Sequence, residues 1–172
     1  MDKKFYFHFY RDFYIEYSPL ADTPPATLGG FHLHNLGELI IVEEGASTVI
    51  SDGMIKSVAG SYAIYYPPHA IHQQLNAPNY KYTRWLITID PAYLDGLDFP
   101  DSTFVLNLTA DNLRRLVEPA KLLLFYSGDE KNVDRKLVEA RRRSIVGLML
   151  TELSDILSGG RVELPVGANY IS

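Results

Sequence analysis

The apolar positions of this chain follow two different periods, and the change falls near residue 105. Before it, short apolar runs alternate with turn residues. The clearest turn is Asp52-Gly53, which lies between the runs 47–50 and 54–58 and predicts a β-hairpin. A compact apolar run at 39–42 is expected to end at Gly45. Several short strands at this spacing are typical of a β-sandwich or a β-barrel, not of βαβ units.

Residues 5–17 read FYFHFYRDFYIEY and are aromatic on both faces of an extended chain. This stretch predicts one or two strands pressed against the barrel, or an arm across its mouth. Packing as an edge strand is favoured over a binding role.

After residue 105 the apolar positions recur at helical spacing. Thr109 is expected to cap a first helix, which Pro119 must kink or restart because proline lacks an N–H. Asn132 is expected to cap a longer second helix that ends at Gly159-Gly160. The two amphipathic helices predict an antiparallel hairpin, whose apolar surface either meets a partner or packs on the barrel.

The chain is therefore expected to have three segments. Residues 1–105 are predicted to form the β-barrel with its aromatic N-terminal arm. Residues 106–160 are predicted to form a helical dimerisation hairpin. Residues 161–172 are expected to be a linker toward a domain outside this chain.

Composition narrows the possible functions. The 172 residues include no cysteine, which excludes disulfides, cysteine-ligated zinc and thiol catalysis. The sequence shows neither a signal peptide nor a membrane span, so we expect a cytoplasmic protein with no membrane partner. The net charge of −5 does not suit nucleic acid. The one basic run, 141–143, is read as a solvated helix face, because consecutive helical positions point in different directions.

Four histidines fall in two short blocks, and these blocks carry the candidate chemistry. His32 and His34 point to the same side of a strand, with Glu38 again in phase. In the second block His72 is followed in phase by Gln74 if the segment is extended. Three neutral imidazoles and one carboxylate suit Fe(II), Mn(II), Ni(II), Zn(II) or Cu(II).

The two blocks resemble the two motifs of the cupin superfamily. The first motif, G-x5-H-x-H-x3-E-x6-G, is matched except that Ala26 replaces the leading glycine. The second, G-x5-P-x-G-x2-H-x3-N, is matched by His72 and Asn76, with Pro67 one residue late and His69 in place of glycine. The resemblance implies a double-stranded β-helix (jelly-roll) barrel, so the chain is expected to be mainly β with C-terminal helices. It further implies a divalent metal such as Zn, Ni, Mn or Fe, and four ligands: His32, His34, Glu38 and His72.

The whole layout also resembles the N-terminal domain of AraC-type transcription regulators. The shared pattern is H-x-H…E-L-x-x-V-x-x-G, then a strand ending I-x-P (Ile89-Asp90-Pro91), then a pair of helices. This resemblance implies a small effector, often a sugar, in the barrel, a homodimer through the helices, and DNA contact only through a domain absent from this chain.

Two functions follow, and the sensing role is favoured over an enzyme. The first is an effector-sensing, dimerising domain of an AraC-type regulator. The second is a metal-dependent cupin enzyme, an isomerase or a dioxygenase.

Arg84 can hold an anionic group if it faces inward and is surface if it faces outward; the sequence leaves both open. Tyr62, Tyr65, Tyr66, Tyr82 and Trp85 are expected around the pocket, mostly as core. The residues predicted to bind the effector are His32, His34, Glu38, Tyr62, His72, Gln74 and Arg84.

Overall fold

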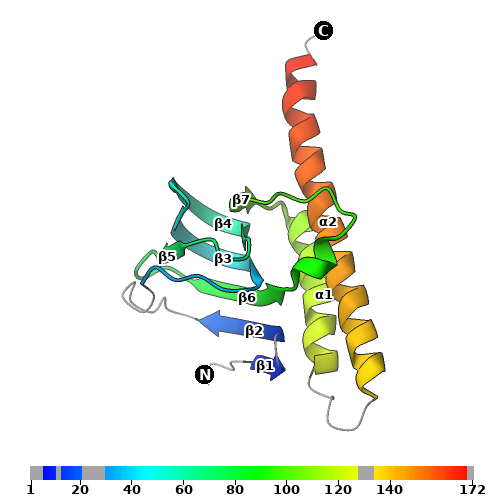
Figure 1. Cartoon of the computed structure of the whole chain (residues 1–172). Helices are drawn as coiled ribbons and strands as arrows, with labels where there is room; N and C mark the ends of the chain where they lie inside the picture. The colour runs from blue at the N-terminus through cyan, green and yellow to red at the C-terminus, as the bar shows by residue number, and fades with distance from the viewer. Residues whose placement is uncertain (1–5, 11–12, 21–29, 128–133, 170–172) are drawn as a thin grey trace.

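A curled antiparallel β-sheet is followed by two long helices that lie against one of its faces (Figure 1). The computed structural model describes residues 6–10, 13–20, 30–127 and 134–169, with the backbone alone at 6–10, 20 and 160–169. The elements are β1 (Tyr6–Tyr10), β2 (Phe13–Leu20), β3 (Gly37–Ser51), β4 (Met54–Tyr66), β5 (His72–Asn76), β6 (Tyr82–Ile89), a 3-10 helix η2 (Pro91–Leu94), β7 (Phe104–Asn107), α1 (Ala110–Ser127) and α2 (Arg135–Asn169). Ala26 and Asn132 lie outside the described residues.

The long strand β3 organises the sheet, whose order is β1-β2-β6-β3-β4-β7, with β5 on β3. The first half of β3 pairs with β6 and the second half with β5, while β4 runs along its other edge. Between these halves the register shifts at Val42–Gly45. The predicted strand end at Gly45 is therefore wrong: Gly45 lies at a bulge, where an ideal Cβ would stand 2.8 Å from both Tyr82 and Val42 side chains.

The aromatic N-terminal stretch forms two strands at one edge of the sheet. β1 pairs antiparallel with β2, and β2 pairs antiparallel with β6. The hairpin predicted at Asp52-Gly53 is confirmed, since both residues have positive φ between β3 and β4. Positive φ at both central positions is the geometry that Asp-Gly favours.

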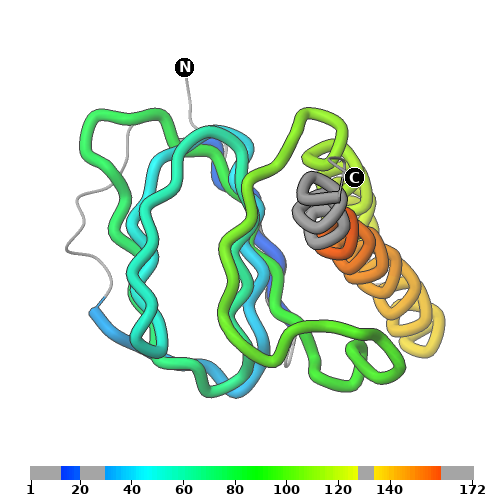
Figure 2. Tube along the Cα trace, turned by 90° about the horizontal axis from the view of Figure 1, so that it is seen from above, coloured from blue at the N-terminus to red at the C-terminus, as the bar shows by residue number. Residues whose placement is uncertain are grey.

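Alternation along the strands separates two hydrophobic cores. Inward side chains such as Ile40, Val42 and Ile64 fill the barrel. Outward side chains such as Leu39, Ile41 and Ile87 pack against Leu116, Val146 and other apolar residues of the helices. Figure 2 shows the resulting layers: two walls of strands, with the helical pair beside one of them.

The two helices form the predicted antiparallel pair. Thr109 caps α1, because its hydroxyl accepts from the Asn112 N–H at 3.2 Å. The guanidinium of Arg115 on α1 binds the carboxylates of Glu152 and Asp155 on α2. Pro119 lies buried inside α1, which does not restart there.

The predicted helix end at Gly159-Gly160 is wrong, because α2 continues to Asn169. Glycine lowers helix propensity by only about 1 kcal/mol and does not by itself stop a helix. The start of α2 is capped by Asp134, whose carboxylate accepts from the Lys136 N–H at 3.0 Å. Among the described residues, none of the helices is both long and apolar enough to cross a bilayer.

Candidate functional site

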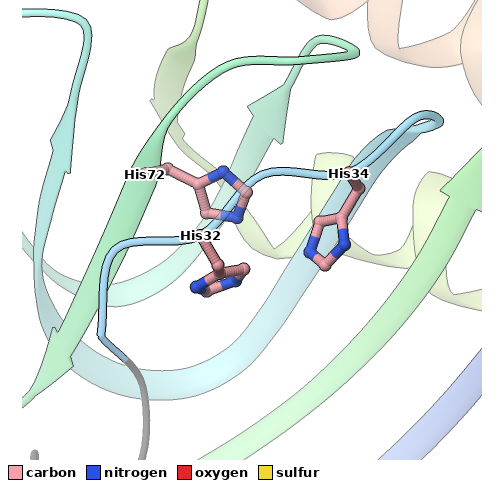
Figure 3. Close-up of side chains that lie close together, drawn as sticks. All are labelled: His32, His34 and His72. Carbon is pink, nitrogen blue, oxygen red and sulfur yellow. The ribbon is translucent and has the colours of Figure 1, made fainter.

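A short backbone ladder joins the two histidine blocks across the mouth of the barrel. His32 and His72 exchange two N–H···O=C hydrogen bonds of 3.1 and 3.0 Å, and the His69 N–H donates to the His34 carbonyl at 2.8 Å. Because side chains alternate along an extended chain, this pairing places the rings of His32, His34 and His72 on one face. Figure 3 shows the three side chains close together.

The turn before His72 explains one departure from the cupin pattern. His69 has φ +65°, in the left-handed region that glycine adopts without cost. The cupin motif that this block resembles has glycine at this position, and glycine readily adopts the backbone conformation found at His69.

The three imidazoles are arranged as a metal-ligand set. One ring nitrogen from each of His32, His34 and His72 lies within 4.8 Å of the others. The Nδ1 atoms of His32 and His72 are 2.8 Å from the carbonyls of Gly30 and Ala70. Such second contacts fix the ring orientation of histidines that bind metals. We call these three residues the histidine cluster.

Two buried atoms next to the cluster have no partner among the described residues: the Nε2 of His72 and the hydroxyl of Tyr66. The two rings stack, with centroids 3.8 Å apart. Burial lowers the pKa of His72 and raises the pKa of Tyr66, whose hydroxyl also faces the charge of Glu38. His72 is therefore a neutral imidazole at neutral pH, which is the form that binds a metal. Buried polar atoms normally have a partner, so this pair fits a bound ion or ligand.

Glu38 lies beside the histidine cluster but outside its 4.8 Å group. Its Oε2 is 3.1 Å from the Nε2 of His34, while burial raises the pKa of its carboxyl and His34 opposes that rise. The predicted four-residue set is thus brought together as three histidines with an adjoining carboxylate.

An open cleft of about 680 Å³ adjoins the cluster at the barrel mouth. On one side it is lined by His34 and Glu38, and on the other by residues of β2 and β6. The remaining lining residues are Phe13, Tyr14, Leu33, Asn35, Leu36, Gly37, Leu86 and Thr88.

Tyr62 and Gln74, predicted to bind the effector, belong to a separate buried polar network. Gln74 Nε2 is 2.7 Å from the Tyr82 hydroxyl, 2.9 Å from Asn76 Oδ1 and 3.0 Å from Ser47 Oγ. The hydroxyls of Ser47 and Tyr62 are 2.5 Å apart. We call these five residues the glutamine network; none of them lines the cleft.

Arg84 faces the inside of the barrel, the orientation that the sequence left open. Its neighbours on the same face of β6, Tyr82 and Leu86, pack in the inner core. Arg84 donates to Glu16 Oε1 at 3.0 Å, and the Tyr14 hydroxyl donates to Glu16 Oε2 at 2.7 Å.

Two aromatic residues expected around the pocket lie elsewhere. Tyr65 and Trp85 point outward and pack between the sheet and the helices. The Trp85 indole N–H donates to Glu43 at 2.9 Å. Tyr62, Tyr66 and Tyr82 do face the barrel interior.

Sequence reasoning missed Glu16 and the role of Tyr14. The stretch 13–18 alternates apolar with polar or amphipathic residues, and such alternation is the signal of a strand with one polar face. The aromatic residues around Glu16 made this alternation hard to recognise.

No protein-family model and no curated protein sequence matches the chain. Solved structures do. Apo ToxT K231A from Vibrio cholerae is 7% identical over 85% of this chain and 57% of its own, with a TM-score of 0.54. A cupin 2 conserved barrel domain protein from Salinispora arenicola is 23% identical over 48% of this chain and 66% of its own, with a TM-score of 0.39. An RmlC-like cupin from Shewanella frigidimarina is 19% identical over 48% of this chain and 71% of its own, also at 0.39.

The fold prediction is confirmed. The chain folds as a mainly β barrel followed by an antiparallel helical hairpin. The likeness to ToxT extends over the helices as well as the barrel, since it covers 85% of the chain. The chain spans little more than half of ToxT.

Proposed function

We propose that this chain is the effector-sensing and dimerising domain of an AraC-type transcription regulator. A small metabolite, for which the family resemblance suggests a sugar, binds in the cleft at the barrel mouth. The structural likeness to ToxT, an AraC-family regulator, supports this proposal because it includes the barrel and the helices together. Contact with DNA is assigned to a separate domain.

The observation that carries the proposal is that Phe13 meets both the cleft and α2. Phe13 lines the cleft. The guanidinium of the buried Arg142 on α2 lies 4.2 Å from the centroid of the same ring. The expectation of a solvated face at 141–143 is therefore wrong for Arg142, which packs against β2. A ligand that moves Phe13 acts directly on the helix.

The helices carry exposed apolar side chains that suit a second copy of the chain. Leu122 and Phe125 on α1 are 45% and 73% exposed, and Leu148 on α2 is 50% exposed. Leu122 and Phe125 are three residues apart and so share one helix face. Their burial in a homodimer would remove apolar surface from water.

A divalent transition metal fits the histidine cluster. His32, His34 and His72 would hold it, with Glu38 as an adjoining carboxylate, and Zn, Ni, Mn and Fe all accept such nitrogen and oxygen donors. When bound, the ion would supply a Lewis acid at the edge of the cleft. The buried Nε2 of His72, which has no hydrogen-bond partner in the described part of the chain, supports this part of the proposal.

A metal-dependent enzyme, an isomerase or a dioxygenase, is the second candidate. The observation that favours it is the direct opening of the cleft onto His34, which gives a substrate access to an ion on the cluster. Turnover of a metabolite by the zinc, iron or manganese form would establish it in place of the sensing role.

A single experiment addresses the sensing role. The full chain, purified without nickel resin, is screened by amide NMR against a library of sugars and other small metabolites. The proposal expects at least one compound to shift the cleft residues Leu86 and Thr88 and also Arg142 on α2. Shifts in the cleft with no change at α2, or no binding by any metabolite, would contradict it.

Dimerisation is measured on the same sample. Sedimentation is expected to show a dimer that Phe125→Lys converts to a monomer, while Ile55→Lys, an equally exposed apolar site on the far hairpin, leaves it a dimer. A monomeric wild-type chain would refute the dimerising role.

A further inference from the structure

The charge class of the effector follows from the pairing of Arg84 with Glu16, if the cleft is the effector site proposed above. Among the residues that the structure describes, none that lines the cleft is lysine or arginine. Among the described residues, the guanidinium closest to the cleft along the chain is that of Arg84, two residues before Leu86 on the same face of β6. Of the described cations, Arg84 is therefore the one that an anionic effector would need.

Arg84 already forms an ion pair with Glu16. Its Nη2 and Nε lie 3.0 and 3.3 Å from the same oxygen of Glu16. Glu16 is 6% exposed, and the second oxygen of its carboxylate accepts from the Tyr14 hydroxyl at 2.7 Å. Both oxygens of Glu16 are thus held, so the carboxylate is fixed toward Arg84.

The pairing is built by strand register and does not depend on a flexible surface contact. Ser18 lies opposite Arg84, and Glu16 lies opposite Leu86, on adjacent antiparallel strands. The two charged residues are therefore diagonal neighbours on one face. A buried, hydrogen-bonded ion pair of this kind neutralises the guanidinium before any ligand arrives.

Within the described part of the chain, the cleft presents no other counter-charge for an anion. Its titratable lining residues are Tyr14, His34 and Glu38, and Glu38 adds a carboxyl that repels a second carboxylate whenever it is ionised. An anion entering the cleft would lose its hydration without gaining a free cation.

We propose that Glu16 is a specificity-determining residue that withholds Arg84 and makes the cleft selective for uncharged polar effectors. Glu16 acts through Arg84 and is not itself a contact of the ligand. Releasing Arg84 should admit anions of the same size.

The test compares glucose with glucuronate, which share a ring and differ by one carboxylate. The full chain is dialysed against EDTA, because an ion on the histidine cluster would itself attract a carboxylate. Binding is followed at pH 7.5 by the amide shifts of Leu86 and Thr88. The wild type is expected to bind glucuronate at least tenfold more weakly than glucose, or not at all.

Glu16→Gln keeps the shape of the side chain and an acceptor for Tyr14 but removes the charge that neutralises Arg84. It is expected to improve glucuronate binding at least tenfold without the same gain for glucose. Adding Arg84→Met should abolish the gain. Glu44→Gln, which removes the same charge from an exposed pair with Lys81 and lies outside the cleft lining, is the matched control and should show no gain.

Glucuronate binding to the wild type as tight as glucose binding would overturn the inference, even if Glu16→Gln failed to fold. A folded Glu16→Gln chain with no gain for glucuronate would also overturn it. These results leave the sensing role standing, whereas a cleft that binds no metabolite of any charge refutes the sensing role itself.

Discussion

One polar cluster lies inside the barrel and another lies at its mouth, where His32 and His34 are exposed, and their hydrogen bonding differs. In the glutamine network, hydrogen bonds of 2.5 to 3.0 Å link the side chains of all five residues. In the histidine cluster the Nε2 of His72, and beside it the hydroxyl of Tyr66, have none among the described residues. The first arrangement is what a structural network requires, and the second fits the proposed role of the histidine cluster as a binding site.

The largest expected effect tests whether the glutamine network stabilises the fold. Gln74→Leu would remove the hydrogen bonds that Gln74 Nε2 donates to the buried Tyr82 hydroxyl, to Ser47 and to Asn76. We expect the free energy of unfolding to fall by about 2–3 kcal/mol, since an unsatisfied buried polar group costs about 1–3 kcal/mol. Urea denaturation measures it. Gln73→Leu, on the opposite face of β5, should cost clearly less; equal losses would mean that the network does not carry stability.

Zinc binding tests the proposed role of the histidine cluster as a metal site. At a free Zn²⁺ concentration one hundred times the Kd, the wild type should gain about 2.7 kcal/mol of stability. His72→Ala should remove this gain, and Gln74→Leu should keep it even though its own stability is lower. Thermal unfolding with and without zinc gives the difference. A zinc gain that survives in His72→Ala would place the ion elsewhere.

Gly45→Ala tests whether the glutamine network depends on the bulge in β3. The added Cβ would stand 2.8 Å from the Tyr82 ring and 3.1 Å from the Tyr62 hydroxyl. Overpacking of this kind costs about 1–3 kcal/mol, measurable by urea denaturation. Gly147→Ala in α2 meets open space and should instead stabilise the chain by about 0.5–1 kcal/mol. Retained zinc binding in Gly45→Ala would show that the two clusters are independent.

The smallest effect concerns pH and the histidine cluster alone. Burial lowers the pKa of His72 below its ordinary value of 6.5, so below that pH the unfolded chain binds more protons than the folded one. Stability should therefore fall as the pH falls from 6.5 through the lower pKa of the folded state. The Tm of the zinc-free wild type, followed from pH 8 to pH 5, should drop more than that of His72→Gln. Parallel curves would contradict the buried, neutral state of His72.

Local patterns in the sequence determined several parts of this protein. Asp52-Gly53 specified a hairpin because both residues tolerate positive φ. Thr109 specified the start of α1 because its hydroxyl accepts a free N–H of the first turn. The in-phase spacing of His32 and His34 specified that two imidazoles share a face. Each of these features depends on residues a few positions apart.

Contacts between distant residues were decided only by the tertiary structure. Arg84 meets Glu16 across 68 positions, so neither its inward orientation nor its engagement was visible in the sequence. Trp85 was expected at the pocket but faces the helices, because strand register decides which set of alternating side chains points inward. His72 joins His32 through a ladder between segments that local periodicity cannot pair. The local sequence pattern determined which residues share a face of a strand or helix. The tertiary packing determined what each face contacts.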